Sequence, residues 1–194
     1  MARWRPAWSG GVAKGFRVAA LLCAALAIPA AAADDAIAAA AADDAIAGAG
    51  ADVGTVASLA AEVERLVERA KPDDWALRRA CLYYAFAGQH LLARQGISAS
   101  VWVGAVVYDP GTYASHPIWP HAWLETATHF IDYAALPRWG TVRVLPHHLV
   151  ARTPAEVRPG STRVLALRRI EDLDLIAYLR FHRKRFDRIV RGDD

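Results

Sequence analysis

The chain has 194 residues, of which 55% are hydrophobic and 22% charged, a composition that suits one globular domain and excludes a wholly disordered chain. The formal charge is +3, but four basic residues and no acidic one lie within residues 1–33, so without that segment the charge is −1. This distribution argues against a nucleic-acid-binding protein, and we expect no nucleic-acid partner.

Residues 1–33 have the features of a secretory signal peptide. A basic stretch, residues 1–17, precedes an apolar run over 18–33 that ends in the small residues typical of a cleavage site. Pro29 interrupts the run, which falls short of the ~20 apolar residues that a membrane-spanning helix needs. We expect export to the periplasm or the medium, with membrane attachment only if this segment stays uncleaved.

The number of cysteines bears directly on function. The chain has two, and Cys23 lies inside the predicted signal, so the exported chain would keep Cys81 alone. A framework of disulfides is thereby excluded. The remaining thiol is either reactive or a small buried hydrophobic side chain.

Residues 34–54 are predicted to form a flexible tether. The sequence AADDAIA occurs at 32–38 and again at 41–47, and the segment carries few large side chains. It cannot bury enough apolar surface to offset the entropy lost on ordering. The globular domain is therefore expected to span residues 55–194.

Two helices are predicted at the start of this domain. Residues 55–70 place apolar side chains three and four apart, with Thr55 or Ser58 available as N-cap. Asp73-Asp74 offers an N-cap for a second helix from about 75 to 94, closed by Gly96. Cys81 would lie in the first two turns of that helix, where unpaired N–H groups and the helix dipole favour a thiolate. The apolar stripe of this helix is expected to consist of Leu77, Cys81, Tyr84, Ala85, Gly88 and Leu92.

The pattern then changes from helix to strand. Residues 97–109 are rich in β-branched and aromatic side chains, 121–126 and 129–134 resemble two short strands joined tightly, and 141–145 resembles a further strand. Residues 170–190 have the apolar spacing of a helix. Helices, a strand meander and a final helix predict an α+β fold with an antiparallel sheet.

The predicted hairpin places two chemically important side chains together. A loop of even length would put His121 and Asp132 on one face of the hairpin, whereas an odd length would separate them unless a bulge intervened. A cysteine nucleophile needs a base, and the base needs an orienting acceptor. Because the chain has no asparagine, that acceptor must be a carboxylate, with Glu125 as the reserve. Cys81, His121 and Asp132 are therefore the candidate catalytic residues.

The ordered segments RRACLYYAFAGQHLLARQGI, SASVWVGAVV, PHAWLE and FIDYA, within residues 73–134, are similar to the bacterial transglutaminase-like cysteine hydrolase superfamily, which includes the leader peptidases of lasso-peptide maturation. The resemblance implies a papain-like fold, with Cys81 as nucleophile, His121 as general base and acid, and Asp132 as orienter. The glutamine that often supplies an oxyanion donor before the cysteine is missing. The backbone N–H of Cys81, helped by the indole of Trp75, is expected to replace it. Trp123 is the other candidate for the wall of the cleft.

These features predict a cysteine-dependent hydrolase or acyltransferase that acts on a peptide, protein or small amide or ester without a cofactor. His116 and the pair His147-His148 could join His121 and Asp132 around zinc, but their spacing is unlike that of a zinc site, so no metal is expected. The alternative is a non-catalytic, exported binding module in which Cys81 is merely buried. The basic stretch 180–188 is expected to be a solvated helix face, with an anionic docking surface as the alternative.

Overall fold

The computed structural model describes residues 52–112, 115–168 and 173–193. The predicted signal peptide and residues 34–51 of the predicted tether lie outside these ranges. Within them the chain forms helices and one six-stranded sheet, which confirms the α+β class. None of the helices in the described ranges is both long and apolar enough to cross a membrane.

The helices α2 (Val53–Ser58) and α3 (Ala60–Ala70) replace the single helix predicted over 55–70. The predicted N-caps were wrong: the Asp52 carboxylate caps α2 by accepting from the Thr55 N–H at 3.2 Å, whereas the Ser58 hydroxyl donates to the Thr55 carbonyl. The N-cap position of α3 is occupied by Leu59, which has no side-chain acceptor to offer.

The second predicted helix starts later than expected. Residues Leu77–Arg79 form a short 3-10 turn, and α4 (Cys81–Arg94) begins at the cysteine, with Ala80 as an N-cap that offers no side-chain bond. Leu77, which was predicted to belong to the apolar stripe of this helix, lies before α4 and is exposed, so its assignment was wrong. The C-terminal end is as predicted: Gly96 has φ of 73°, and the Ile97 N–H bonds to the Leu92 carbonyl at 2.9 Å.

The sheet has the order β4-β3-β2-β1-β6-β5. All pairings are antiparallel except that of β5 with β6, so the predicted antiparallel sheet is confirmed with one parallel pair at its edge, formed by two strands that were not predicted. The strands are β1 (Ser100–Tyr108), β2 (Ile118–Glu125), β3 (His129–Asp132), β4 (Arg143–Pro146), β5 (Val150–Ala151) and β6 (Val164–Arg168).

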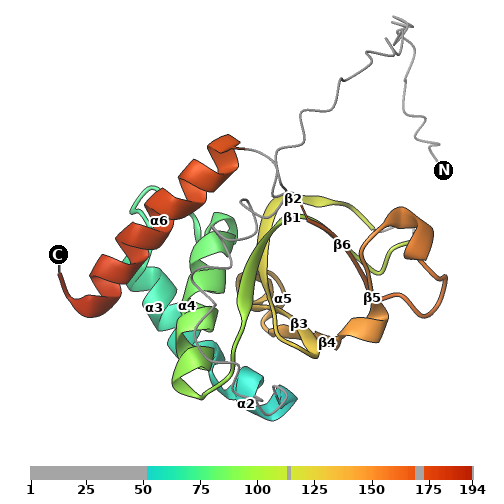
Figure 1. Cartoon of the computed structure of the whole chain (residues 1–194), viewed down its shortest axis with the longest axis horizontal. Coiled ribbons are helices and arrows are strands. Elements are labelled where there is room, and N and C mark those ends of the chain that lie inside the picture. The colour runs from blue at the N-terminus through green and yellow to red at the C-terminus, as the bar shows by residue number, and fades with distance from the viewer. Residues whose placement is uncertain (1–51, 113–114, 169–172, 194) are drawn as a thin grey trace, which may run out of the picture. The chain divides into compact units, whose positions relative to one another are not determined.

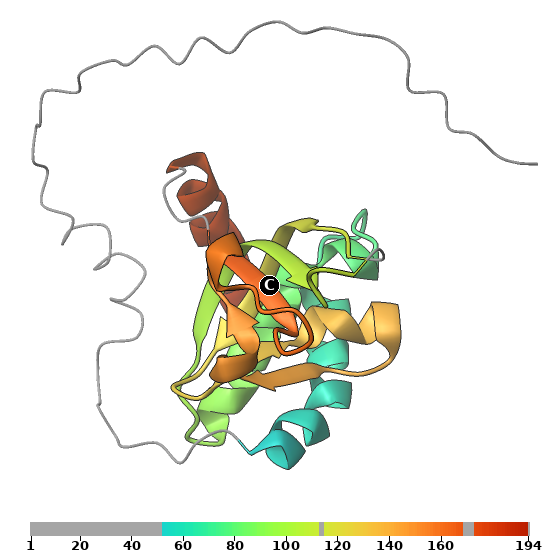
Figure 2. The same ribbon diagram turned by 90° about the vertical axis from the view of Figure 1, so that its right-hand side faces the viewer.

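Each face of the sheet has its own core. Figure 1 shows the sheet curling back on itself, with α4 against its outer face; β5 and β6 lie on the side away from α4, nearest the viewer in Figure 2. Helices α3, α4 and α6 (Leu173–Arg191) pack with β1 to β3 in the larger core, where α4 is buried on nearly all sides. The smaller core, on the other face, is built by Val106, Trp123, Phe130, Val150, Val164 and Ala166.

Two details of the sheet decide where the site residues lie. Leu124 pairs with Ile131, and the Thr126 N–H bonds to the His129 carbonyl at 2.9 Å, so the β2–β3 loop has two residues and the even length holds. At the other end of β2, Gly104 pairs with His121 while Val106 pairs with Ile118. Strand β2 thus carries one extra residue immediately before His121, a bulge of the kind that redirects a neighbouring side chain.

Candidate active site

Cys81 is a free, half-buried thiol and the first residue of α4. The intrahelical bonding of this turn starts with the Tyr84 N–H, which donates to the Ala80 carbonyl at 3.0 Å. The preceding N–H groups have no acceptor within the helix, and together with the helix dipole they favour an anion beside them. The sulfur lies 4.0 Å from the carbonyl oxygen of Pro120, the residue before His121. The helix start therefore suits a thiolate, and it meets β2 at the bulge.

His121 follows the bulge and is 5% exposed. Its Nε2 lies 2.7 Å from Oδ2 of Asp132. Burial opposes a positive charge on the ring, but the Asp132 carboxylate, reinforced by a hydrogen bond and charge interaction with Cys81, outweighs it and raises the pKa of His121 from 6.5 to about 10. With Nε2 held by Asp132, Nδ1 is the nitrogen left to exchange a proton with the thiol.

Asp132 ends β3 and is fully buried. Its Oδ2 accepts from His121 and also from the hydroxyl of Tyr108, while Oδ1 has no hydrogen-bond partner among the described residues. Burial and then the Asp132 charge raise the pKa of Tyr108 well above 10, so the phenol keeps its proton and remains a donor. The carboxylate is thus fixed from two sides through one oxygen.

Tyr108 was not among the residues predicted for the site. It ends β1, and its ring lies edge-on to Trp139 with ring centres 5.0 Å apart. In the sequence it is an aromatic residue at the end of a strand that pairs with the strand of His121. Its place in the site can be predicted only when the register of β1 on β2 is known, because the register decides on which face of the sheet each side chain lies.

Two of the subsidiary predictions were wrong. Trp123 is 1% exposed and its indole N–H donates to Glu125 at 2.7 Å, so it belongs to the smaller core and cannot line a cleft. Glu125 cannot be the reserve orienter of His121, because its carboxylate is bound by Arg152 at 2.6 and 2.9 Å and by Arg168 at 2.5 Å.

Trp75, the predicted oxyanion donor, is partly buried at the edge of the larger core. Its ring stacks on Tyr178 of α6 with centres 6.4 Å apart, and it lies 4.9 Å from the ring of His182. A role for its indole in binding an oxyanion remains a prediction. Among the described residues, no group of three His, Cys, Asp or Glu side chains is placed to hold a metal ion.

Comparison with known proteins gives a family but few individual relatives. A model of the transglutaminase-like superfamily matches residues 11–146. No curated protein matches the chain. A crystal structure described only as a genomics target is 14% identical, with a TM-score of 0.44, over 66% of this chain and 77% of that one. At that TM-score the likeness supports no statement on fold or function.

Proposed function

Because the chain belongs to the transglutaminase-like superfamily, whose members are typically cysteine-dependent hydrolases or acyltransferases acting on peptides or proteins, we propose that it attacks an amide, peptide or ester carbonyl with Cys81. The superfamily predicted from the sequence is thereby confirmed, while the narrower likeness to lasso-peptide leader peptidases stays a prediction. The observation that carries the proposal is the His121–Asp132 bond of 2.7 Å beside the start of α4.

The first half of the reaction forms an acyl-enzyme. The Cys81 thiolate adds to the substrate carbonyl carbon, and the C=O electron pair moves to the oxygen, which the N–H groups at the start of α4 stabilise. The oxyanion then collapses as His121 gives its proton to the departing amine or alcohol. The C–N or C–O bond breaks, and a thioester remains on Cys81.

The second half regenerates the enzyme. Water or an amine attacks the thioester while neutral His121 removes its proton, and the C–S bond breaks to release the acyl product and the thiolate. Asp132 keeps the imidazole in one tautomer and orientation throughout. Tyr108 acts as a positioning residue, because it binds the carboxylate and not the reacting atoms.

Alkylation by iodoacetamide between pH 5 and 9 tests this proposal in a Cys23→Ser chain, where Cys81 is the sole thiol. We expect rapid alkylation at pH 6, where an ordinary thiol is hardly ionised. His121→Ala should slow it at least about tenfold, because the thiolate loses its cation. The same chain unfolded in urea is the matched control. A native thiol that reacts no faster at pH 6 than the unfolded one would favour the alternative, a binding module with a buried cysteine.

Export is the second part of the proposal. The basic and apolar pattern of residues 1–33 supports a cleavable signal. N-terminal sequencing of the protein recovered outside the cytoplasm tests it. A first residue near Asp34 is expected, and recovery of the intact chain from the cytoplasm alone would contradict it.

A further inference from the structure

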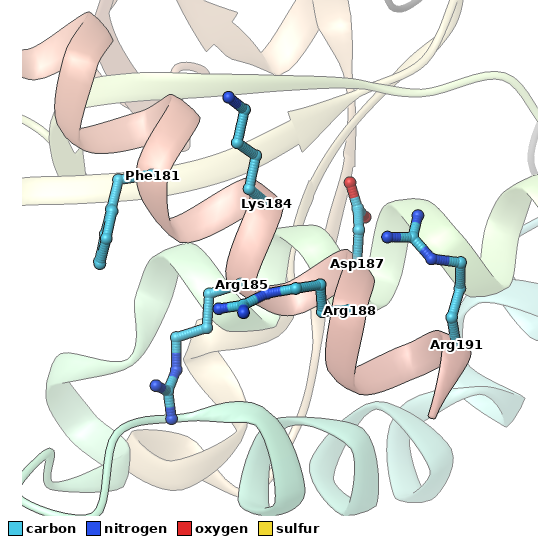
Figure 3. Close-up of a pocket in the computed structure, with 6 residues that line it drawn as sticks. All are labelled: Phe181, Lys184, Arg185, Asp187, Arg188 and Arg191. Carbon is cyan, nitrogen blue, oxygen red and sulfur yellow. The ribbon is translucent and has the colours of Figure 1, made fainter. Parts of the chain in front are cut away.

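The C-terminal helix α6 presents a basic face that the proposed reaction does not use. The α6 basic face consists of Lys184, Arg185, Arg188 and Arg191, which line a surface hollow of about 450 Å³ with Phe181 and Asp187. Figure 3 shows that all six side chains extend from this one helix. Phe181 is 67% exposed, so its ring is open to an apolar partner.

Most of this positive charge is unneutralised. Asp187 bonds Arg183 at 2.9 Å, and Arg191 bonds Asp193 at 2.8 Å. Within the described residues, no ion pair holds the other three cations of the face. Arg185 is turned inward, with its Nε buried and its charge acting on the Tyr83 hydroxyl, so Lys184 and Arg188 are the cations open to a ligand. Guanidinium groups bind carboxylates through paired, charge-assisted hydrogen bonds, so this surface is suited to an acidic ligand.

The same helix passes the candidate nucleophile. Tyr178 is 44% exposed and stacks on Trp75. The hydroxyl of Tyr83, two residues after Cys81 on α4, lies 2.8 Å from Nδ1 of His182, so α6 lies against the first turn of α4. Burial raises the pKa of Tyr178, and so does the charge of Cys81. Tyr178, Phe181, Arg185 and Arg188 are spaced at three- and four-residue intervals. They therefore follow one another along a single stripe of the helix.

The length of this stripe sets the size of a ligand that could use both ends. Tyr178 and Arg188 are ten residues apart on α6, which corresponds to about 15 Å at the helical rise. An extended polypeptide covers that distance in about five residues. A polypeptide that passes Tyr178 would therefore reach Arg188, at the far end of the stripe, about five residues further along.

We propose that the α6 basic face is a docking surface for polypeptide substrates that carry acidic residues about five positions from the bond attacked by Cys81. This rests on the proposed function, and it adds a class of substrate to it. Lys184 and Arg188, the cations of the face that are open to a ligand, bind the acidic side chains, and Phe181 packs against an apolar neighbour. A polypeptide is favoured over a lipid surface because the face continues into the stripe beside the thiol and because enzymes of this superfamily act on peptides or proteins.

Peptides with a central epoxysuccinyl group, an electrophile that alkylates cysteine, test the proposal. Two peptides carry a block of four aspartates five residues from the electrophile, on its N-terminal side in one peptide and on its C-terminal side in the other. Two matched peptides carry asparagines in place of the aspartates. Two weak surface ion pairs together predict that Cys81 of the Cys23→Ser chain reacts about fivefold faster with an aspartate peptide at low salt. The preference should fade at 0.5 M salt, where exposed charges are screened.

Substitution locates the effect. In Lys184→Gln/Arg188→Gln the ratio of aspartate to asparagine rates should fall to about one. The matched control is Arg65→Gln/Arg69→Gln, which removes the same charge from the exposed face of α3 and should leave the ratio unchanged.

Three outcomes would overturn this proposal. Equal rates for aspartate and asparagine peptides, with fast iodoacetamide alkylation at pH 6, would refute docking and leave the proposed function standing. Slow iodoacetamide alkylation would instead refute the proposed function. Binding of vesicles containing phosphatidylglycerol through Lys184 and Arg188, without any preference for aspartate peptides, would assign the face to an anionic lipid surface.

Discussion

Replacing Asp132 with asparagine removes the charge that controls His121 and keeps the shape of the side chain. The carboxylate outweighs the effect of burial, and its removal leaves burial as the strongest influence on the imidazole. The pKa of His121 should then fall from about 10 to below its ordinary 6.5. The asparagine amide can also donate to Nε2, which leaves the ring proton on Nδ1, the nitrogen that must accept the proton of the thiol.

The size of the effect follows from the pKa values. A tenfold change in proton affinity is worth about 1.4 kcal/mol, so a fall from about 10 to 6.5 or lower removes on the order of 5 kcal/mol of imidazolium stabilisation. Because the pKa is raised in the native protein, the charged ring is present below about pH 10 and is lost as the pH rises through that value. In Asp132→Asn most of the imidazole should be neutral at pH 7.

Two measurements check this reasoning. An NMR titration of the His121 ring should show the charged form persisting above pH 9 in the native protein and disappearing below pH 7 in Asp132→Asn. Iodoacetamide alkylation of Cys81 at pH 6 to 7 should slow at least about tenfold in the variant, since the thiolate loses its cation. A ring that still titrates near pH 10 in Asp132→Asn would show that Asp132 does not control His121.

Three further substitutions test the surroundings. Tyr108→Phe removes one of the two donors to buried Asp132, so unfolding in urea should show a loss of about 2 kcal/mol, and alkylation at pH 6 should slow; an unchanged rate would exclude a positioning role. Glu125→Gln leaves two arginines without their buried carboxylate and should lower the free energy of unfolding by about 3 kcal/mol. Adding 0.5 M salt to the native protein should not cause the same loss, because the carboxylate is buried. Gly88→Ala would place a methyl group 2.4 Å from the Tyr133 ring and should cost about 1 to 3 kcal/mol, whereas Ala87→Gly, which adds no atoms, should not crowd that ring.

The elements with a strong local pattern were predictable, and those that depend on distant partners were not. The β2–β3 hairpin and α6 carry their periodicity in the sequence. Strand β5 has two residues, too few for any alternation, and β6 is stabilised by pairing with β1 about 60 residues earlier in the chain. The start of α4 was misplaced because Asp73-Asp74 matches an N-cap pattern, whereas the chain uses those residues in a turn.

The candidate site likewise has features that the local sequence predicts and features that depend on distant partners. The shared face of His121 and Asp132 follows from one hairpin and one parity rule, so the sequence alone could predict it. The bulge before His121 and the Tyr108 bond to Asp132 both depend on how β1 aligns with β2. Trp123 was predicted to line the cleft because it lies on the same face of the hairpin as His121. It is buried instead, because its indole donates to Glu125, and Glu125 is held by Arg152 and Arg168 from the part of the sheet that was not predicted.

The contact between α4 and the end of β3 explains how a thiol and an imidazole from separate elements keep their relative positions. Tyr133 follows Asp132 in the chain, packs its ring against Gly88 of α4, and donates its hydroxyl to the Val56 carbonyl of α2 at 2.9 Å. Because Gly88 has no side chain, the ring can lie directly on the helix. The residue that orients His121 is therefore one peptide bond from the residue that fixes the helix carrying Cys81, so core packing at Gly88 and catalytic geometry at Asp132 are physically coupled.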